Sequence, residues 1–453
     1  MENAVPPRIK PFYKLLLGFA LAAFSLAGFR FVLQSFNHPA IYKKDFLSGY
    51  LIAKALQAGV DPYQPIPELA RRWTLAAPFT KLDHPTPHTA ALGWLCYPFS
   101  WLPYEQAAWL WFIFELLCLA LALKLLFRGL GIPLPPHRWA VAFFCAFAWM
   151  PVIDDLWFGQ FNLVLLVLWL GSWLALRAGH EQRGGALLGL LMTLKLAGWP
   201  VILWLAWQRR WRSVIAASLT VGLLHAAMIA LHGWPLVRDY YFKYGPLVSA
   251  LYRVRDYNLS LWTFGDRLFT PFGFSFTSAP LLHSPVLAKL TGVGLPLLAL
   301  AFTLWAVSQI RSFDVGFAAL MSVSLLLNPI AWTHYMVALC LTLALTLQRL
   351  QRMGWPRAWI ILLGLAVGPL CLPTKTWALM TVMLAGQAGA DGQIVVPFWA
   401  AWFTAVPTLA ALGVSWLLWR VERLAQQSAA TPWHTSQTAE SYGLVAPALP
   451  PLA

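Results

Sequence analysis

Charged side chains are scarce in this sequence, and acidic ones are the scarcest. Only 11% of the 453 residues are charged, with 17 acids against 32 Lys and Arg, whereas 59% are hydrophobic and 26 are Trp. A soluble core of this length could not hide so much apolar surface, whereas lipid covers it without cost. The sequence therefore predicts an all-α, polytopic membrane protein.

Cysteine is also rare, and no pair of cysteines is spaced for chemistry. The five cysteines lie within or beside apolar segments, with no CxxC and no Cys/His spacing suited to zinc. Such residues are typical small hydrophobes of membrane helices. The sequence predicts no disulfide framework, no metal and no redox cofactor.

The basic excess does not indicate nucleic-acid binding. The net charge is +15, but many Lys and Arg residues fall in short connections between apolar runs, where cationic loops stay cytoplasmic and contact anionic headgroups. Membrane lipids, and no nucleic acid, are the partners that this pattern predicts.

The apolar runs predict about 11 to 13 transmembrane helices. Several runs are shorter than the roughly 20 residues of a full span, so some are predicted to be broken or re-entrant. The first is too long for a signal peptide and is read as a retained helix. The runs lie near 12–34, 106–128, 138–152, 160–178, 184–198, 200–210, 213–232, 286–309, 313–329, 335–350, 357–373 and 396–420.

Basic residues at alternate ends of these runs predict that both termini are cytoplasmic. Two long loops, about 35–105 and 233–285, then lie outside, while residues 1–425 form one transmembrane domain and 426–453 a disordered tail. The outer loops are rich in cations, which suit an enzyme that handles phosphate-bearing lipids. Among these cations are Lys43, Lys44, Arg71, Arg72, Lys81, Arg238, Lys243, Arg253, Arg255 and Arg267.

Asp45 opens the stretch "DFLSGYLIAKALQAGVDPY", about ten residues after the first span. Its apolar residues follow a helical spacing that stops at Gly59 and at Asp61-Pro62-Tyr63, so we expect a short amphipathic helix near the headgroups. Asp45 can cap this helix, because Asp is a preferred N-cap residue. A carboxylate fixed beside lipid is equally well placed to act as a base.

This stretch resembles glycosyltransferase family 87, polyprenyl-phosphate-sugar-dependent enzymes of the GT-C class that include alpha-1,2-mannosyltransferases. The resemblance continues through "HPTPHTAALGWLCYPFSWLPYEQAAWLW" (84–111), "GQFNLVLLVLWL" (159–170), "GGALLGLLMTLKLAGWPVILWLAWQRRWR" (184–212), "NLSLWTF" (258–264) and "NPIAWTHYMV" (328–337). These segments cover most of residues 40–340, and the set is more specific than any one of them.

The resemblance implies a GT-C fold and the transfer of a sugar, usually mannose, from a polyprenyl phosphate to a hydroxyl of a lipid or glycan acceptor. Such a transfer would occur on the outer face of a bacterial inner membrane, with inversion, without a cofactor and with Asp45 as general base. A phosphate leaves without a general acid, so one base suffices. Asp61, Glu68 and Asp83 lie in the same loop, so the choice of Asp45 rests on the motif.

Two residues are predicted from the resemblance to bind the donor phosphate or the acceptor. Lys195 stands in an apolar run, where snorkelling to the headgroups is the alternative. His334 ends "NPIAWTH", where a structural role is the alternative. Asn328 and Ala331 depart from the two serines of the family pattern in this element.

Six further residues complete the predicted substrate site. Gln160, Asn162 and Asn258 lie in the resembling segments, although capping and packing explain them equally well. Tyr50 belongs to the Asp45 motif, and Arg255 is an outer cation. His88 ends "HPTPH", whose prolines disfavour the helix that a metal-binding His pair would need.

A transporter or lipid flippase remains the alternative function. The number of spans, Lys195 and the intramembrane acid Glu115 would all allow it. Glu115 is expected to pair with a polar group of a neighbouring helix or to mark an ion path. A catalytically inactive relative that acts in assembly is a third reading. The sequence leaves open glucose, galactose or arabinose as the sugar.

Overall fold

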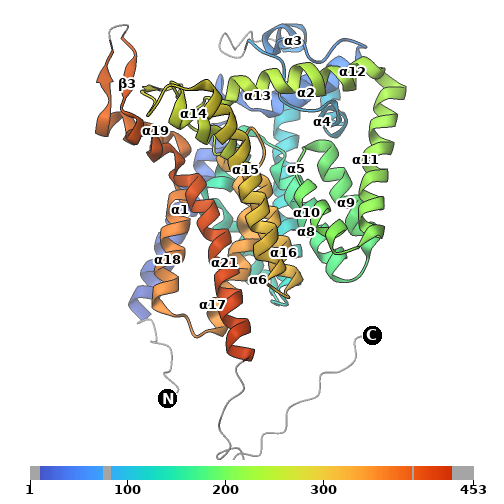
Figure 1. The fold of residues 1–453 in the computed structure, drawn as a ribbon. Helices are drawn as coiled ribbons and strands as arrows, with labels where there is room; N and C mark the ends of the chain where they lie inside the picture. The colour runs from blue at the N-terminus through green and yellow to red at the C-terminus, as the bar shows by residue number, and fades with distance from the viewer. Residues whose placement is uncertain (1–10, 75–82, 390–391, 431–453) are drawn as a thin grey trace, which may run out of the picture.

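The computed structural model describes residues 11–74, 83–389 and 392–430, which form a helical bundle with one small sheet (Figure 1). Five stretches of these residues are long and apolar enough to cross a membrane. Four of them are single helices, α1 (Pro11–Gln34), α5 (Tyr104–Gly129), α11 (Trp211–His232) and α15 (Pro285–Ser308). The fifth combines α20 (Phe398–Ala401), the 3-10 turn η8 (Trp402–Ala405) and α21 (Val406–Ala430).

Two further apolar stretches are sharply bent. The first runs through α6 (Pro136–Cys145) and η3 (Ala146–Ala148) and turns by 79° into α7 (Met150–Phe158). The second runs through α18 (Arg357–Val367) and η7 (Gly368–Cys371) and turns by 91° into α19 (Thr374–Ala385). A proline stands at each bend, Pro151 in the first turn of α7 and Pro373 just before α19, where proline ends or starts a helix.

Shorter helices fill the centre of the bundle. Trp169, Trp173 and Phe317 are buried there, and α16 is buried along most of its length. These helices are α8 (Asn162–Arg177), α9 (Glu181–Leu194), α10 (Trp199–Trp207), α16 (Phe313–Leu326) and α17 (Leu339–Arg352).

Helices α9 and α11 approach each other through glycine. A Cβ atom on Gly185 would lie 2.1 Å from the Ser213 carbonyl oxygen, and one on Gly189 would lie 2.5 Å from that of Ala217. Small residues that let backbones come this close are typical of helix contacts in membranes.

We expect Gly185→Ala to destabilise the protein by about 1–3 kcal/mol, because the added methyl group overpacks the contact with Ser213. Thermal unfolding in detergent measures this change. Gly222→Ala is the matched control, because nothing that the structure describes lies within 4 Å of the Cβ position of Gly222 on α11. Equal effects of the two substitutions would contradict the close approach.

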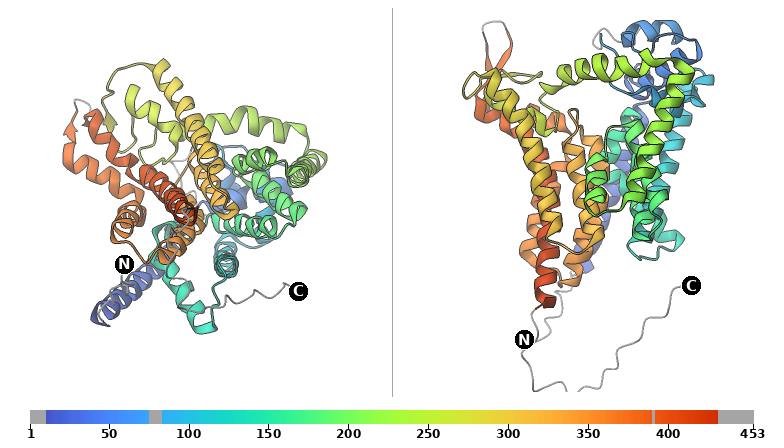
Figure 2. Two further views of the ribbon diagram at one scale, coloured as in Figure 1. Left: turned by 60° about the horizontal axis from the view of Figure 1, so that its bottom comes forward. Right: turned by 45° about the vertical axis from the view of Figure 1, so that its right-hand side comes forward.

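Short helices form a layer at one end of the bundle, where α12 and α13 lie across it (Figures 1 and 2). We refer to these elements as the outer layer. The layer comprises η1 (Ala40–Lys43), α2 (Phe46–Gln57), α3 (Ile66–Trp73), α4 (Ala90–Cys96), η2 (Phe99–Trp101), α12 (Trp234–Asp239), the π-turn η4 (Tyr240–Tyr244), α13 (Gly245–Arg253), η5 (Leu261–Thr263) and α14 (Phe264–Phe269). The 3-10 segment η6 (Thr333–Ala338) lies beneath it and packs against α7 and α8.

The small sheet joins the second long loop to the segment after α19. Its strands are β1 (Thr277–Ser278), β2 (Gln387–Ala388) and β3 (Ile394–Val396), in the order β1-β3-β2. Strand β1 pairs with β3 in parallel, with Thr277 opposite Val395, and β2 pairs with β3 antiparallel.

The all-α, polytopic fold predicted from the sequence is confirmed, with differences in detail. Length and composition support five spans among the described residues, or seven if each bent pair counts as one, instead of 11 to 13. The other predicted runs form helices that are too short. Figure 1 places the start of α1 and the end of α21 at the same end of the bundle, opposite the outer layer. Helix α21 continues to Ala430, past the predicted start of the tail at 426, and residues 431–453 lie outside the described residues.

Helix α2 differs most from its prediction. It ends as expected before Gly59, whose φ of +64° favours glycine. However, it does not lie on the surface, because Phe46 to Ala53 and then Ala55 and Leu56 are all buried. Apolar residues on every face are typical of a helix inside the protein.

Candidate active site

A cavity of about 750 Å³ lies between the outer layer and the end of the bundle. The first loop, α7, the end of α9, the η4–α13 region, η6 and the start of α19 all contribute to its walls. Five predicted site residues line it, and these are Asp45, His88, Gln160, Lys195 and His334. The sequence segments that resemble one family thus converge on one space.

Asp45 precedes the first residue of α2, but its side chain does not cap that helix. Its backbone is helical (φ −69°, ψ −19°) and its carboxylate makes no cap hydrogen bond. The Gln160 side-chain amide donates to Asp45 Oδ2 instead. The predicted capping role is therefore wrong, and the carboxylate is directed at the cavity.

The first loop is fastened to the end of α7. The Asp45 amide N–H donates to the Phe158 carbonyl at 2.7 Å. Lys44 Nζ donates to the carbonyls of Leu156 and Trp157 at 3.2 and 2.7 Å. The last carbonyls of a helix have no partner within it, so Lys44 satisfies groups that α7 itself leaves open.

Burial raises the pKa of Asp45 to about 6, against the opposing effects of the Gln160 hydrogen bond and of the charges on Lys195 and Lys44. Loss of hydration disfavours the charged carboxylate, whereas the donor and the cations favour it. A carboxylate with such a pKa is a stronger base than an exposed Asp and is still ionised near neutral pH.

Lys195 directly follows the last residue of α9, in an extended conformation (φ −152°, ψ 130°). Its Nζ donates to Asn162 Oδ1 at 3.0 Å and lies 3.0 Å from the centre of the Tyr335 ring. The Asn162 amide in turn donates to Asp155 Oδ1 at 2.7 Å. Asn162 therefore positions the lysine from a small adjoining cavity that both residues line.

Two imidazoles complete the polar wall. Burial, together with the nearby Lys195 charge, lowers the pKa of His88 to about 3, so this ring is neutral. His334 is 4% exposed, and its Nε2 has no hydrogen-bond partner among the described residues. A neutral ring can donate a hydrogen bond to an oxyanion without taking up a proton.

Besides Asn162, which lines only the small adjoining cavity, three predicted substrate residues do not line the large cavity. Tyr50 is buried, and its hydroxyl donates to the Leu102 carbonyl at 2.9 Å. The Arg255 guanidinium stacks 3.6 Å from the centre of the Phe274 ring. Asn258 is also buried and acts on the backbone, as its packing alternative predicted.

Asn258 holds the segment that precedes His334. Its amide donates to the Pro329 carbonyl at 3.0 Å, and its Oδ1 accepts from the Ala331 amide N–H at 3.0 Å. Arg267 of α14 donates to the Asn258 carbonyl at 3.2 Å and so fixes Asn258 itself.

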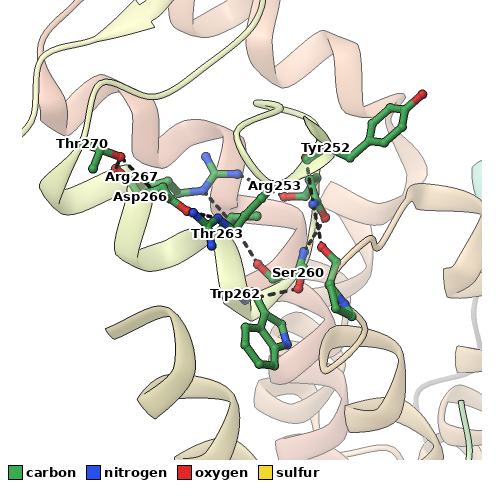
Figure 3. Close-up of polar contacts among 10 residues, drawn as sticks. Tyr252, Arg253, Ser260, Trp262, Thr263, Asp266, Arg267 and Thr270 are labelled. Carbon is green, nitrogen blue, oxygen red and sulfur yellow. Dashed lines mark hydrogen bonds and ion pairs between the residues drawn. The ribbon is translucent and has the colours of Figure 1, made fainter. Parts of the chain in front are cut away.

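Arg267 lies in a network that combines side chains of α13, η5 and α14 with Thr404 of η8 and with backbone carbonyls. Figure 3 shows Arg267 beside Thr263 and Asp266, with Arg253 close to Asp266 and the Tyr252 ring pointing away. The Arg253–Asp266 ion pair measures 2.9 Å. The loop cations are thus mainly structural, and of those that the structure describes only Lys43 lines the cavity. Lys81 lies outside the described residues.

Glu115 does not make the predicted polar pair. It is fully buried in α5, and neither carboxylate oxygen has a hydrogen-bond partner within the described residues. The charges near it are Asp155 and Lys44.

Several residues that line the cavity were not predicted from the sequence. Asp154 lies just beyond the predicted run 138–152, and Lys375 lies just beyond the run 357–373. The others include the aromatic residues Trp157, Tyr240, Tyr241, Tyr252, Tyr257 and Trp332. Intramembrane acids indicate function by default, and that signal could have identified Asp154.

Fold and site together define a polytopic membrane protein with a polar cavity at one end of its helix bundle. The family model of glycosyltransferase family 87 matches residues 87–329, more than half of the chain, and the protein belongs to this family. It is therefore a polytopic membrane protein of a glycosyltransferase family. Gln160, Asn162, Lys195 and Asn258 lie within the matched range, whereas Asp45 and His334 lie outside it.

Curated relatives match a shorter part of the chain. They are the alpha-(1->3)-arabinofuranosyltransferases of two Mycobacterium tuberculosis strains, CDC 1551 / Oshkosh and ATCC 25618 / H37Rv. Each is 28% identical over 163 residues, which is 35% of this chain and 36% of the relative. The match thus spans about a third of the length of these relatives. No solved structure matches the chain.

Proposed function

We propose that this protein moves a sugar from a polyprenyl phosphate to a hydroxyl group of a lipid-linked or glycan acceptor, with inversion, and that Asp45 is the general base. The observation that carries the proposal is the placement of Asp45 and Lys195 in one cavity, each held by an amide side chain. A base for the acceptor and a cation for the leaving phosphate are the two groups that this reaction requires.

In this mechanism the acceptor oxygen attacks the anomeric carbon as Asp45 takes its proton. The bond between that carbon and the phosphate oxygen breaks, and the polyprenyl phosphate leaves as an anion. Gln160 fixes the carboxylate by donating to Oδ2, which leaves the other oxygen free for the acceptor proton. One displacement at the anomeric carbon inverts its configuration.

Lys195 stabilises the charge that develops on the phosphate. Its ammonium group is already oriented by Asn162 and Tyr335, so it needs little reorganisation during the reaction. The neutral rings of His88 and His334 line the same cavity and can donate to phosphate oxygens.

The sugar that we propose first is mannose, the usual donor sugar of the family. The arabinofuranosyltransferases among the relatives favour arabinofuranose as a second candidate. Aromatic rings make up much of the cavity wall and suit the apolar face of either sugar.

The distribution of basic residues supports an extracytoplasmic site in a bacterial inner membrane. Arg128, Arg177 and Arg352 lie in the last turns of helices α5, α8 and α17, on the side of the bundle away from the outer layer. Basic helix ends remain in the cytoplasm. Both ends of the described chain would then lie on the cytoplasmic face of the membrane, and the cavity would lie on the opposite face.

The test is sugar transfer by the purified protein in lipid nanodiscs, with membrane lipid extract as acceptor. Radiolabelled polyprenyl-phosphate mannose and polyprenyl-phosphate arabinofuranose are supplied separately, and the products are separated and sequenced. We expect labelled product from one of the two donors, with an anomeric configuration opposite to that of the donor. Failure with both, or retention of configuration, would contradict the proposed function.

The rate of transfer is expected to fall as the pH drops through about 6, because Asp45 must be ionised to act as a base and its pKa is raised to about 6. The Gln160 hydrogen bond lowers this pKa, so Gln160→Leu should move the acid limb of the kcat/KM profile to higher pH. A limb near pH 4 in the wild type, or a downward shift in the variant, would show that another group titrates.

A further inference from the structure

Helix α7 carries two adjacent carboxylates that face different surroundings. Successive residues of a helix point about 100° apart. Asp155 is fully buried and accepts from Asn162 and from the Leu163 amide N–H, at 2.7 and 3.3 Å. Asp154 is partly buried and lines the cavity, where the mechanism above gives it no task.

Asp154 belongs to a polar cluster built from three separate elements. The Thr333 side chain of η6 lies close to its carboxylate, and the Lys375 ammonium of α19 lies within electrostatic range. The Thr333 and Thr374 hydroxyls are 2.9 Å apart. All four residues line the cavity. The two helix bends bring α7 and α19 here, and we call these residues the Asp154 cluster.

Indole rings lie on the same cavity wall as the Asp154 cluster. Trp157 follows Asp154 by three residues on α7, and Trp332 directly precedes Thr333. The Trp332 ring is held against Tyr252 and Tyr257, with ring centres 5.5 and 5.1 Å apart.

This combination suits a carbohydrate. Sugar hydroxyls both donate and accept, so a carboxylate, an ammonium and two hydroxyls can each satisfy one of them. Indole rings cover the apolar C–H face of a sugar ring. A lipid alcohol would present one hydroxyl and leave most of these polar groups without a partner, which is costly in a closed site.

The cluster does not suit the donor phosphate. A carboxyl group offers a phosphate no positive charge, whereas Lys195 does, and the acid near Lys195, Asp155, is already occupied by Asn162. The other cavity carboxylate, Asp45, is engaged by Gln160. Of the two substrates, the hydroxyl-rich one therefore suits Asp154 better than the donor phosphate does.

We propose that Asp154, Thr333, Thr374 and Lys375 form a subsite for the hydroxyl groups of the acceptor, and that the acceptor end is a sugar, not a lipid alcohol or a protein side chain. This inference rests on the proposed function, because only that function makes the bound sugar the acceptor. The binding of a neutral sugar at this cluster does not depend on which donor is used.

The first experiment measures binding without any reaction. Saturation-transfer NMR is recorded on the protein in nanodiscs with methyl glycosides of mannose, glucose, galactose and arabinofuranose, and with 1-butanol as the simple alcohol. We expect the wild type to bind at least one glycoside more strongly than butanol, and Asp154→Ala to weaken that binding roughly tenfold or more. Asp154→Asn keeps an oxygen that accepts a hydrogen bond, so its affinity for the glycoside should lie between those of the wild type and Asp154→Ala.

The matched control is Asp239→Ala. Asp239 lies in the outer layer, pairs with Arg238 and does not line the cavity, so glycoside binding should stay at the wild-type level. Wild-type protein that binds no glycoside, or equal binding by wild type and Asp154→Ala, would overturn the inference. This outcome is distinct from failure of the proposed function, which appears as absence of transfer from either donor.

The second experiment separates acceptor from donor. With the bound glycoside as acceptor, Asp154→Ala and Lys375→Met should raise the KM for the glycoside, by roughly tenfold for Asp154→Ala, and leave the KM for the polyprenyl-phosphate sugar within about twofold. A rise in the donor KM alone would assign the cluster to the lipid phosphate or donor sugar and overturn the acceptor subsite.

Discussion

Asp45→Asn is expected to lower the rate of sugar transfer by about 10²- to 10⁴-fold, the range that a general base contributes. The amide has the size of the carboxylate and can still accept the hydrogen bond from Gln160, but it cannot take a proton from the acceptor. Donor binding should change little, because Lys195 is untouched. The measurement is the initial rate of transfer in nanodiscs, alongside thermal unfolding to show that the fold is retained.

Asp61→Asn is the control for this substitution. Asp61 lies in the same loop, is exposed and accepts from the Tyr63 amide N–H at 2.9 Å, a contact that asparagine can keep. Its variant should transfer at the wild-type rate. Near-normal transfer by Asp45→Asn would mean that the base is elsewhere, and Asp154 would then be the other carboxylate of the cavity to examine.

Lys195→Met is expected to reduce kcat/KM by about 10²- to 10³-fold, because it removes the oriented cation that we assign to the leaving phosphate. Methionine retains most of the apolar length of the side chain but neither the charge nor the hydrogen bond to Asn162. If the lysine acts mainly on the developing charge, kcat falls more than the donor KM rises. Steady-state kinetics with varied donor separates the two.

Lys243→Met is the control for the loss of a lysine. Lys243 is an exposed residue of the outer layer that does not line the cavity, and its ammonium lies 4.8 Å from the centre of the Tyr244 ring. Its variant should keep wild-type kinetics. Similar losses in both variants would point to a general effect of net charge at the membrane surface and would contradict a specific role for Lys195.

The sequence predicted the fold class because composition alone determines it. It did not predict the number of spans, since an apolar run has the same composition whether it crosses the membrane or bends inside the protein. The turn between α6 and α7 places Asp154 at the cavity, and neither its angle nor its direction follows from Pro151. For the same reason Lys375, which depends on the bend before α19, drew no attention.

The sequence motifs predicted site residues more reliably where the residue stands next to the end of a helix. Lys195 after α9 and Asp45 before α2 both stand at helix ends, and both reach the cavity. Tyr50 and Asn258 also lie in segments that resemble the family, yet they contact protein backbone at 2.9 and 3.0 Å. Motif membership cannot separate residues that touch the substrate from residues that hold the loop, because both kinds are constrained by the same fold.

The short helix α7 has a consequence for the geometry of the reaction. Its final carbonyls hold the loop of Asp45, its Asp155 holds Asn162 and through it Lys195, and its Asp154 faces the cavity. The nine residues of α7 thus contact, directly or through one neighbour, the proposed base Asp45, the proposed phosphate ligand Lys195 and the proposed acceptor subsite. In the proposed mechanism, one short helix therefore sets the distance between the attacking and the departing oxygen.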